Sequence, residues 1–201
     1  MKNLKSLQEN LRECRACPNM CGTPVHGLAN MAEILLIGQA PGPHEEKLGK
    51  PFAYTAGKTL FKWLADVSSL DEESLREKIY FSAVARCFPG KNAKGGGDRE
   101  PNEAEIKACR KFLAGEVEIL KPKVILAVGK LAIREVLGPA IFSKSSSLTD
   151  VIGKKFFVSF HGIPTYVIPL PHPSGISSWH KTEPGRSLLQ DALKLATPYL
   201  I

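Results

Sequence analysis

Several features that define other classes of protein are missing from this chain. No apolar run approaches the roughly 20 residues that an α-helix needs to cross a bilayer. Residues 1–5 lead into a polar amphipathic segment and not into the apolar stretch of a secretory signal. Internal repeats and domain linkers are also lacking. We therefore expect a cytoplasmic protein with no membrane association, folded as one domain over residues 1–201.

Cysteine is scarce, and its count of five is odd. An odd number in a chain that reads as intracellular disfavours a disulfide framework and favours metal binding or burial. Cys14 and Cys17 are separated by two residues and followed by Pro18, so both sulfurs can reach one metal ion or cluster. A redox dithiol or two ordinary thiols are the alternatives. Cys109 lies on the apolar stripe of a predicted helix, which by itself is typical of a core thiol.

Acidic residues are in the minority, with 20 Asp and Glu against 27 Lys and Arg and a net charge of +7. Such a balance favours a polyanionic partner, nucleic acid above all.

Apolar runs that read as strands alternate with helical patterns along the chain. Strands are predicted at 33–37, 79–85, 123–129 and 165–169, with an edge strand or hairpin arm at 155–160. Helices are predicted at 3–13, 56–67, 102–120 and 183–196, with one more ending near 137. Asn102 and Glu105 match a capping box at the start of one of them. This alternation predicts a three-layer α/β/α sandwich with a mostly parallel, four-stranded central sheet.

The loop after the first predicted strand combines several features of a ligand site. Gly38 and Gly42 bracket the turn and allow a ligand to approach the backbone. Phe52 follows a proline in the same loop and offers a flat stacking surface. Gly57 and Lys58 then open a helix whose first N–H groups are free to bind anions. An ordinary strand-loop-helix connection with a core phenylalanine is the alternative.

A second such loop follows the last predicted strand. His172 stands between two prolines, so it has few conformations and suits a hydrogen-bond donor aimed at one atom. If the two strands are parallel neighbours, His172 faces residues 38–42 across one crevice. A purely structural histidine is the alternative. Residues 91–99, rich in glycine and lysine, read as a flexible solvated linker.

These segments together resemble the iron–sulfur, family 4 type of uracil-DNA glycosylase. The resemblance rests on CRACP at 14–18, GQAPGPHEEKLGKPFAYTAGKTL at 38–60 and HPSGIS at 172–177, together with Cys87 and Cys109. It implies a [4Fe–4S] cluster on Cys14, Cys17, Cys87 and Cys109, with zinc as the alternative metal. Residues 1–32 would then form an N-terminal helix and a cluster-binding segment, and Cys21 has no assigned role.

The resemblance also implies hydrolysis of the N-glycosidic bond of a flipped-out base in DNA, single- or double-stranded, by a protein expected to be a monomer. His172 would donate to the departing base anion, with Gln39 as the second catalytic position. Base contacts are implied for Gly38, Gln39, Ala40, Phe52, Ala83 and His172, and DNA contacts for Gly57, Lys58, Ser174, Ile176 and Trp179.

Two positions depart from the family pattern. Members usually carry a glutamate where this chain has Gln39, and glutamine can neither act as a base nor carry charge. They also carry an asparagine that reads the base edge where this chain has Ala83, which offers no hydrogen bond. The sequence therefore leaves open whether uracil or another deaminated or damaged base is removed.

Two other classes of protein stay open at this point. A DNA- or damaged-base-binding module with weak or no hydrolysis accounts for Gln39 and Ala83. An iron–sulfur electron carrier accounts for the cysteines but leaves the two strand-end loops unexplained.

Overall fold

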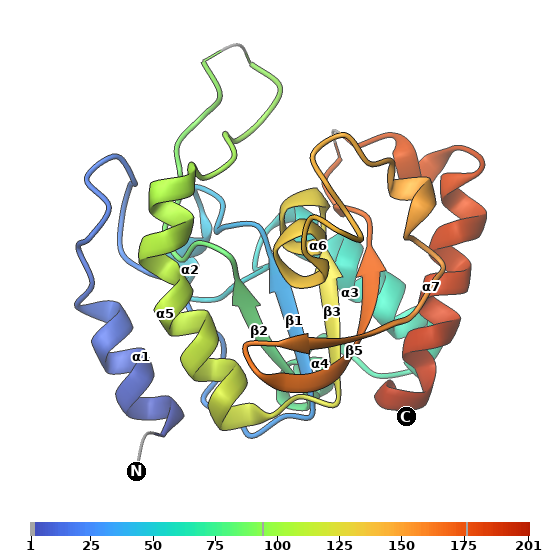
Figure 1. Ribbon diagram of the computed structural model, residues 1–201, viewed down its shortest axis with the longest axis horizontal. Coiled ribbons are helices and arrows are strands. Elements are labelled where there is room, and N and C mark those ends of the chain that lie inside the picture. Colours follow the sequence, from blue (N-terminus) through green and yellow to red (C-terminus); the bar gives the residue numbers. More distant parts are fainter. Residues whose placement is uncertain (1–2, 94, 176) are drawn as a thin grey trace.

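The computed structural model describes residues 3–93, 95–175 and 177–201, which fold around a five-stranded sheet (Figure 1). The strand order is β2-β1-β3-β5-β4, and neighbouring strands are parallel except for β4 and β5. The strands are β1 Ile34–Gly38, β2 Ile79–Ala83, β3 Val124–Val128, β4 Phe156–Phe160 and β5 Ile163–Leu170. The predicted α/β class is confirmed, but the sheet has five strands and not four.

Helices cover both faces of this sheet. In Figure 1, α5 and α6 lie in front of the sheet, whereas α3 and α4 lie behind it. α1 packs against α5, and α7 packs against α3 and β5. The helices are α1 Leu4–Arg12, α2 Glu45–Leu48, α3 Thr55–Ser68, α4 Glu72–Lys78, α5 Glu103–Leu120, α6 Lys130–Leu137 and α7 Gly185–Leu200, with 3₁₀ turns at Leu148–Asp150 and Trp179–Lys181.

Burial explains why β1, β2 and β3 were easy to predict from the sequence. Every residue of β1, β2 and β3 is buried, because helices cover both faces of the sheet and parallel strands then read as continuous apolar runs. β4 instead alternates between partly buried and exposed residues, as an edge strand does. It pairs antiparallel with β5 and adds the fifth strand.

The start of α5 shows how local sequence sets a helix boundary. The Asn102 side chain accepts a hydrogen bond from the N–H of Glu105 at 3.0 Å, and the Glu105 carboxylate accepts one from the N–H of Asn102 at 2.8 Å. The predicted capping box is therefore present.

Within the described ranges, no helix has the length and apolarity that a membrane crossing requires.

Candidate active site

The candidate site lies where the parallel strands end, at the top of the sheet in Figure 1. Gly38 at the end of β1 is in register with Ala83 of β2, and Val128 of β3 is in register with Leu170 of β5. The residues that follow these strands therefore share one edge of the sheet. The two predicted loops are not carried by adjacent strands, however, because β3 lies between β1 and β5.

Phe52 is held against the end of β1. A methyl group on Gly38 would lie only 2.8 Å from Cζ of Phe52, so the ring rests directly on the glycine. The ring is half-buried, and its centre lies 6.2 Å from that of Phe81. Phe52 has a φ of 53°, in the left-handed region that residues other than glycine seldom adopt. Such a conformation persists only where the surroundings fix it.

Two charged side chains that the sequence analysis missed fix this loop from both sides. Glu45 accepts hydrogen bonds from the N–H groups of Gly42 at 2.8 Å and Ala53 at 3.1 Å. Burial raises the pKa of the Glu45 carboxyl, and these N–H donors oppose the rise. On the other side, Arg76 donates to the carbonyl of Phe52 at 3.2 Å and to the preceding carbonyl at 3.0 Å. The ring is therefore in place before any ligand arrives.

Gly57, in the first turn of α3, packs against the same loop. A methyl group there would lie 1.7 Å from the carbonyl oxygen of Phe52, so a side chain at this position forces the loop or the helix to move. Lys58 is exposed beside it, and its own N–H donates to the carbonyl of Tyr54 at 3.1 Å. This packing gives Gly57 a structural role, and the phosphate contacts of Gly57 and Lys58 stay a prediction.

His172 is half-buried just after β5. Its Nδ1 accepts a hydrogen bond from the N–H of Ser174 at 3.2 Å, so the proton of the neutral ring is on Nε2. Burial lowers the pKa of His172; the charge of Asp98 opposes this effect, and His180 adds to it. The ring packs on Gly129, where a methyl group would lie 3.1 Å from Cδ2 and where the φ is +86°. The site therefore contains a neutral imidazole with one N–H donor.

The two positions that depart from the family pattern also lie at this edge. Ala83 is buried, and its carbonyl accepts a hydrogen bond from Nε of Arg86 at 2.9 Å. Gln39 is half-buried, and its amide nitrogen donates to the carbonyl of Arg99 at 3.4 Å. The main-chain carbonyl of Gln39 accepts a hydrogen bond from the N–H of Ala85 at 3.0 Å. Neither side chain supplies a charge to the site.

The residues predicted to contact DNA differ in what surrounds them. Ser174 is half-buried, and its N–H is used by His172. Trp179 is half-buried against the start of α7, since a methyl group on Gly185 would lie 2.8 Å from Cδ2 of the indole. Ile176 lies outside the described residues. The DNA contacts of all three stay predictions.

Four of the five cysteines line one cavity of about 250 Å³: Cys14, Cys17, Cys87 and Cys109, here called the cysteine tetrad. They come from the segment after α1, the segment after β2 and the middle of α5. Cys21 is exposed, and its N–H donates to the carbonyl of Phe88 at 2.8 Å. The fold thus brings together the four cysteines that the resemblance selected.

The tetrad thiols lie within electrostatic reach of one another. Burial raises the pKa of Cys17 and of Cys109, and raises the pKa of Cys87 to about 12, with other tetrad thiols adding to each rise. Four sulfurs around one zinc ion at 2.3 Å would be only about 3.8 Å apart. Over the described ranges, however, no three His, Cys, Asp or Glu side chains form a group that could hold a metal ion. The four thiols nevertheless share one cavity.

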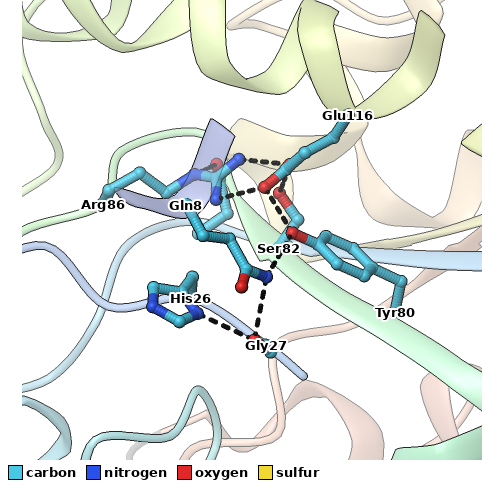
Figure 2. A network of polar contacts seen from close by, with 8 residues as sticks. Gln8, His26, Gly27, Tyr80, Ser82, Arg86 and Glu116 are labelled. Carbon is cyan, nitrogen blue, oxygen red and sulfur yellow. Dashed lines mark hydrogen bonds and ion pairs between the residues drawn. The ribbon is translucent and has the colours of Figure 1, made fainter. Parts of the chain in front are cut away.

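A buried polar network lies between α1, β2 and α5 (Figure 2). Its Arg86 lines the tetrad cavity and donates to the carbonyl of Ala83 at the end of β2. Arg86 and Glu116 form an ion pair whose side chains are each 1% exposed. The Glu116 carboxylate also accepts hydrogen bonds from Tyr80 and Ser82, both at 2.8 Å. Gln8 of α1 donates to the Tyr80 hydroxyl at 3.2 Å. The network therefore joins two helices near the tetrad to β2, whose last residue lies at the site. The helices are α1, which precedes Cys14, and α5, which bears Cys109.

Comparisons with known proteins agree with this geometry. A family model described as "Uracil DNA glycosylase superfamily" matches residues 26–195. A type-4 uracil-DNA glycosylase from Thermotoga maritima is 32% identical over 195 residues, which cover 95% of this chain and 92% of that protein. Another from Sulfurisphaera tokodaii is 31% identical over 182 residues, 87% of this chain and 76% of that protein. A type-5 enzyme from Pyrobaculum aerophilum is 26% identical over 161 residues, 73% of this chain and 68% of that protein. The chain therefore belongs to the uracil DNA glycosylase superfamily.

Proposed function

We propose that this protein is a DNA glycosylase that hydrolyses the N-glycosidic bond of uracil, or of a related deaminated or damaged base, in base excision repair. Membership of the superfamily supports this, as do type-4 relatives that bear the name uracil-DNA glycosylase. The observation that carries the proposal is the neutral His172, half-buried at the strand edge where Phe52 is also fixed.

Base release needs a stabilised leaving group. An enzyme that acts on a base in DNA takes it out of the stack, and here the flipped base would lie on the ring of Phe52 with main-chain contacts from Gly38, Gln39 and Ala40. When the C1′–N bond breaks, its electron pair stays on the base and negative charge gathers on an oxygen such as O2 of uracil. The Nε2–H of His172 would donate to that oxygen, and a donor aimed at developing charge lowers the barrier.

DNA itself would be held through its backbone. Ser174 and the start of α3 at Gly57 and Lys58 are the proposed phosphate contacts, which position the strand without reading its sequence. Ile176 and Trp179 are the proposed residues that fill the gap left by the flipped base. The net charge of +7 supports binding to single- or double-stranded DNA. We propose that the protein acts as a monomer.

The cysteine tetrad would hold a [4Fe–4S] cluster, for which four thiolates are the usual ligands. The shared cavity and the similarity to type-4 relatives favour a cluster over zinc. When bound, the cluster would supply a structural cross-link and no step of the hydrolysis. It would connect the segment after α1 to α5, so that residues 1–32 and the sheet act as one unit.

The choice of base would depend on residue 83, where alanine supplies no side-chain hydrogen bond. A site built to hydrogen-bond a substrate group rejects analogues without it by as much as about 10⁴–10⁵. Ala83 is buried at the end of β2 and supplies no such group, so we expect weaker selectivity for uracil. Ala83→Asn should raise the rate on uracil relative to hypoxanthine and xanthine. An unchanged ratio would remove residue 83 from base selection.

The test of the activity is single-turnover base release from single- and double-stranded oligonucleotides that carry uracil, hypoxanthine, xanthine or an oxidised base. His172→Ala should lower the rate by roughly 10²–10³, the usual loss for one donor to a developing anion, with DNA affinity nearly unchanged. His161→Ala is the matched control, since His161 is an exposed histidine in the β4–β5 turn and should leave the rate as it is. Equal rates for wild type and His172→Ala would remove His172 from the mechanism.

A second candidate function is a binding module for DNA or a damaged base. The lack of a charge at Gln39 and of a hydrogen-bonding side chain at Ala83 favours it. Release of no base by wild type on any of these substrates, together with measurable binding to them, would make this the better assignment.

A further inference from the structure

Between β2 and α5, residues 90–93 and 95–99 are largely exposed, as the predicted linker is, but specific contacts hold them in place. Lys91 and Asp98 pair as an antiparallel bridge, and the N–H of Arg99 donates to the carbonyl of Gly90 at 3.0 Å. In Figure 1 this segment is the green loop that projects beyond the start of α5. Arg99 anchors this loop to the start of α5, because its guanidinium donates to both carboxylate oxygens of Glu105 at 2.7 and 2.6 Å.

This anchoring brings Asp98 to the candidate site. A methyl group on Gly42 would lie 3.8 Å from Oδ2 of Asp98, so the carboxylate is next to the loop that follows β1. Gln39 bonds the carbonyl of the next residue, Arg99, at 3.4 Å. Asp98 also acts on His172, because its negative charge opposes the lowering of the His172 pKa by burial. The Asp98 side chain is 30% exposed and forms an ion pair with Lys91 at 2.7 Å.

Hydrolysis of a glycosidic bond creates a need for such a charge. The sugar becomes positive as the base departs, and the attacking water must lose a proton. A carboxylate serves both needs, but Gln39 stands where related enzymes usually carry a glutamate. Asp98 lies next to the loop that follows β1, and its charge also acts on His172.

We propose that Asp98 is the catalytic carboxylate of this protein and takes over the task that Gln39 cannot perform. The inference rests on the proposed glycosylase function. The C1′–N bond breaks and leaves its electron pair on the base; the oxygen of a water molecule bonds to C1′, and one proton of that water passes to Asp98. The proton then returns through solvent to the base anion, so the products are the free base and an abasic sugar.

The first test compares Asp98→Asn with Lys91→Ala in single-turnover release of uracil. Asp98→Asn keeps the shape of the side chain but removes its charge, and should lower the rate by about 10² or more, the range of general base catalysis. Lys91→Ala breaks the same ion pair but leaves the carboxylate, and should lower the rate less than about threefold. DNA affinity should not fall in Asp98→Asn, because a negative charge is removed. Equal losses in the two variants would mean that Asp98 only holds the loop, and would overturn the proposal.

The second test moves the charge. If a carboxylate at either position can serve, Gln39→Glu in the Asp98→Asn background should recover at least tenfold of the lost rate. A double variant no faster than Asp98→Asn would overturn the claim that Asp98 replaces residue 39. Lys91→Ala/Asp98→Asn should be as slow as Asp98→Asn alone.

A third readout needs no activity. Since the charge of Asp98 opposes the lowering of the His172 pKa, Asp98→Asn should lower that pKa further in an NMR titration, with His172→Ala used to assign the resonance. An unchanged pKa would place Asp98 outside the site. If wild type releases uracil and Asp98→Asn does so equally fast, the proposal fails and the glycosylase function stands. If wild type releases no base, both fail.

Discussion

Substitution of Glu116 tests the buried network that supports the site. Its carboxylate accepts hydrogen bonds from Tyr80, Ser82 and Arg86. The Glu116 side chain is only 1% exposed. Glu116→Gln keeps the volume but leaves the Arg86 charge buried without a counter-charge and turns an amide N–H₂ toward donors. Breaking a buried ion pair in this way costs about 3–5 kcal/mol. That is a large part of the roughly 5–15 kcal/mol by which native domains are stable.

The assay is urea unfolding of the purified protein, with the free energy of unfolding extrapolated to water. Glu103→Gln is the control on the same helix, because the Glu103 side chain is 93% exposed and should cost less than about 1 kcal/mol. Arg86→Met combined with Glu116→Met removes both charges and should cost less than Glu116→Gln alone. A loss below about 1 kcal/mol for Glu116→Gln would refute the reasoning.

Three further predictions concern the metal site, the first loop and DNA binding. Serine at any position of the cysteine tetrad should lower the iron content from about four per chain and bleach the brown colour, whereas Cys21→Ser should change neither; iron retained in a tetrad variant would contradict the ligand set. Gly57→Ala should push the Phe52 carbonyl away, cost about 1–3 kcal/mol of stability and slow base release, as measured by unfolding and single-turnover assays. Affinity for duplex DNA should fall steeply with salt, and Lys58→Ala should reduce the log–log slope by about 0.9; an unchanged slope would remove that phosphate contact.

The fold was largely predictable because its inner strands are buried on both faces. Residues 34–37 and 124–128 are continuous apolar runs followed by glycine, which indicates both the strand and the turn after it. β4 was harder to predict, since Phe157 is 67% exposed and alternation over five residues also suits a hairpin arm. The sequence therefore led to four strands in the central sheet, and the pairing of β4 with β5 adds one.

The site was only partly predictable, for a physical reason. Phe52 and His172 stand in loops whose glycines and prolines mark them. Glu45, Arg76 and Asp98 carry no such mark, because each acts on atoms that only the tertiary fold brings close. Gly129 had a signal, a glycine between a buried strand and a helix, but its contact with His172 needed the strand order.

That strand order also bears on how the protein folds. The parallel neighbours in the order β2-β1-β3-β5 are separated by long stretches of chain, so the residues that pair between them are far apart in the sequence. Chains dominated by such contacts fold slowly, because ordering a long loop must precede the gain from pairing. The first loop, the Asp98 loop and His172 follow β1, β2 and β5, and they meet only after β3 has inserted between β1 and β5. Recovery of base release after dilution from denaturant would therefore report completion of the whole sheet, and would lag behind the return of helical signal.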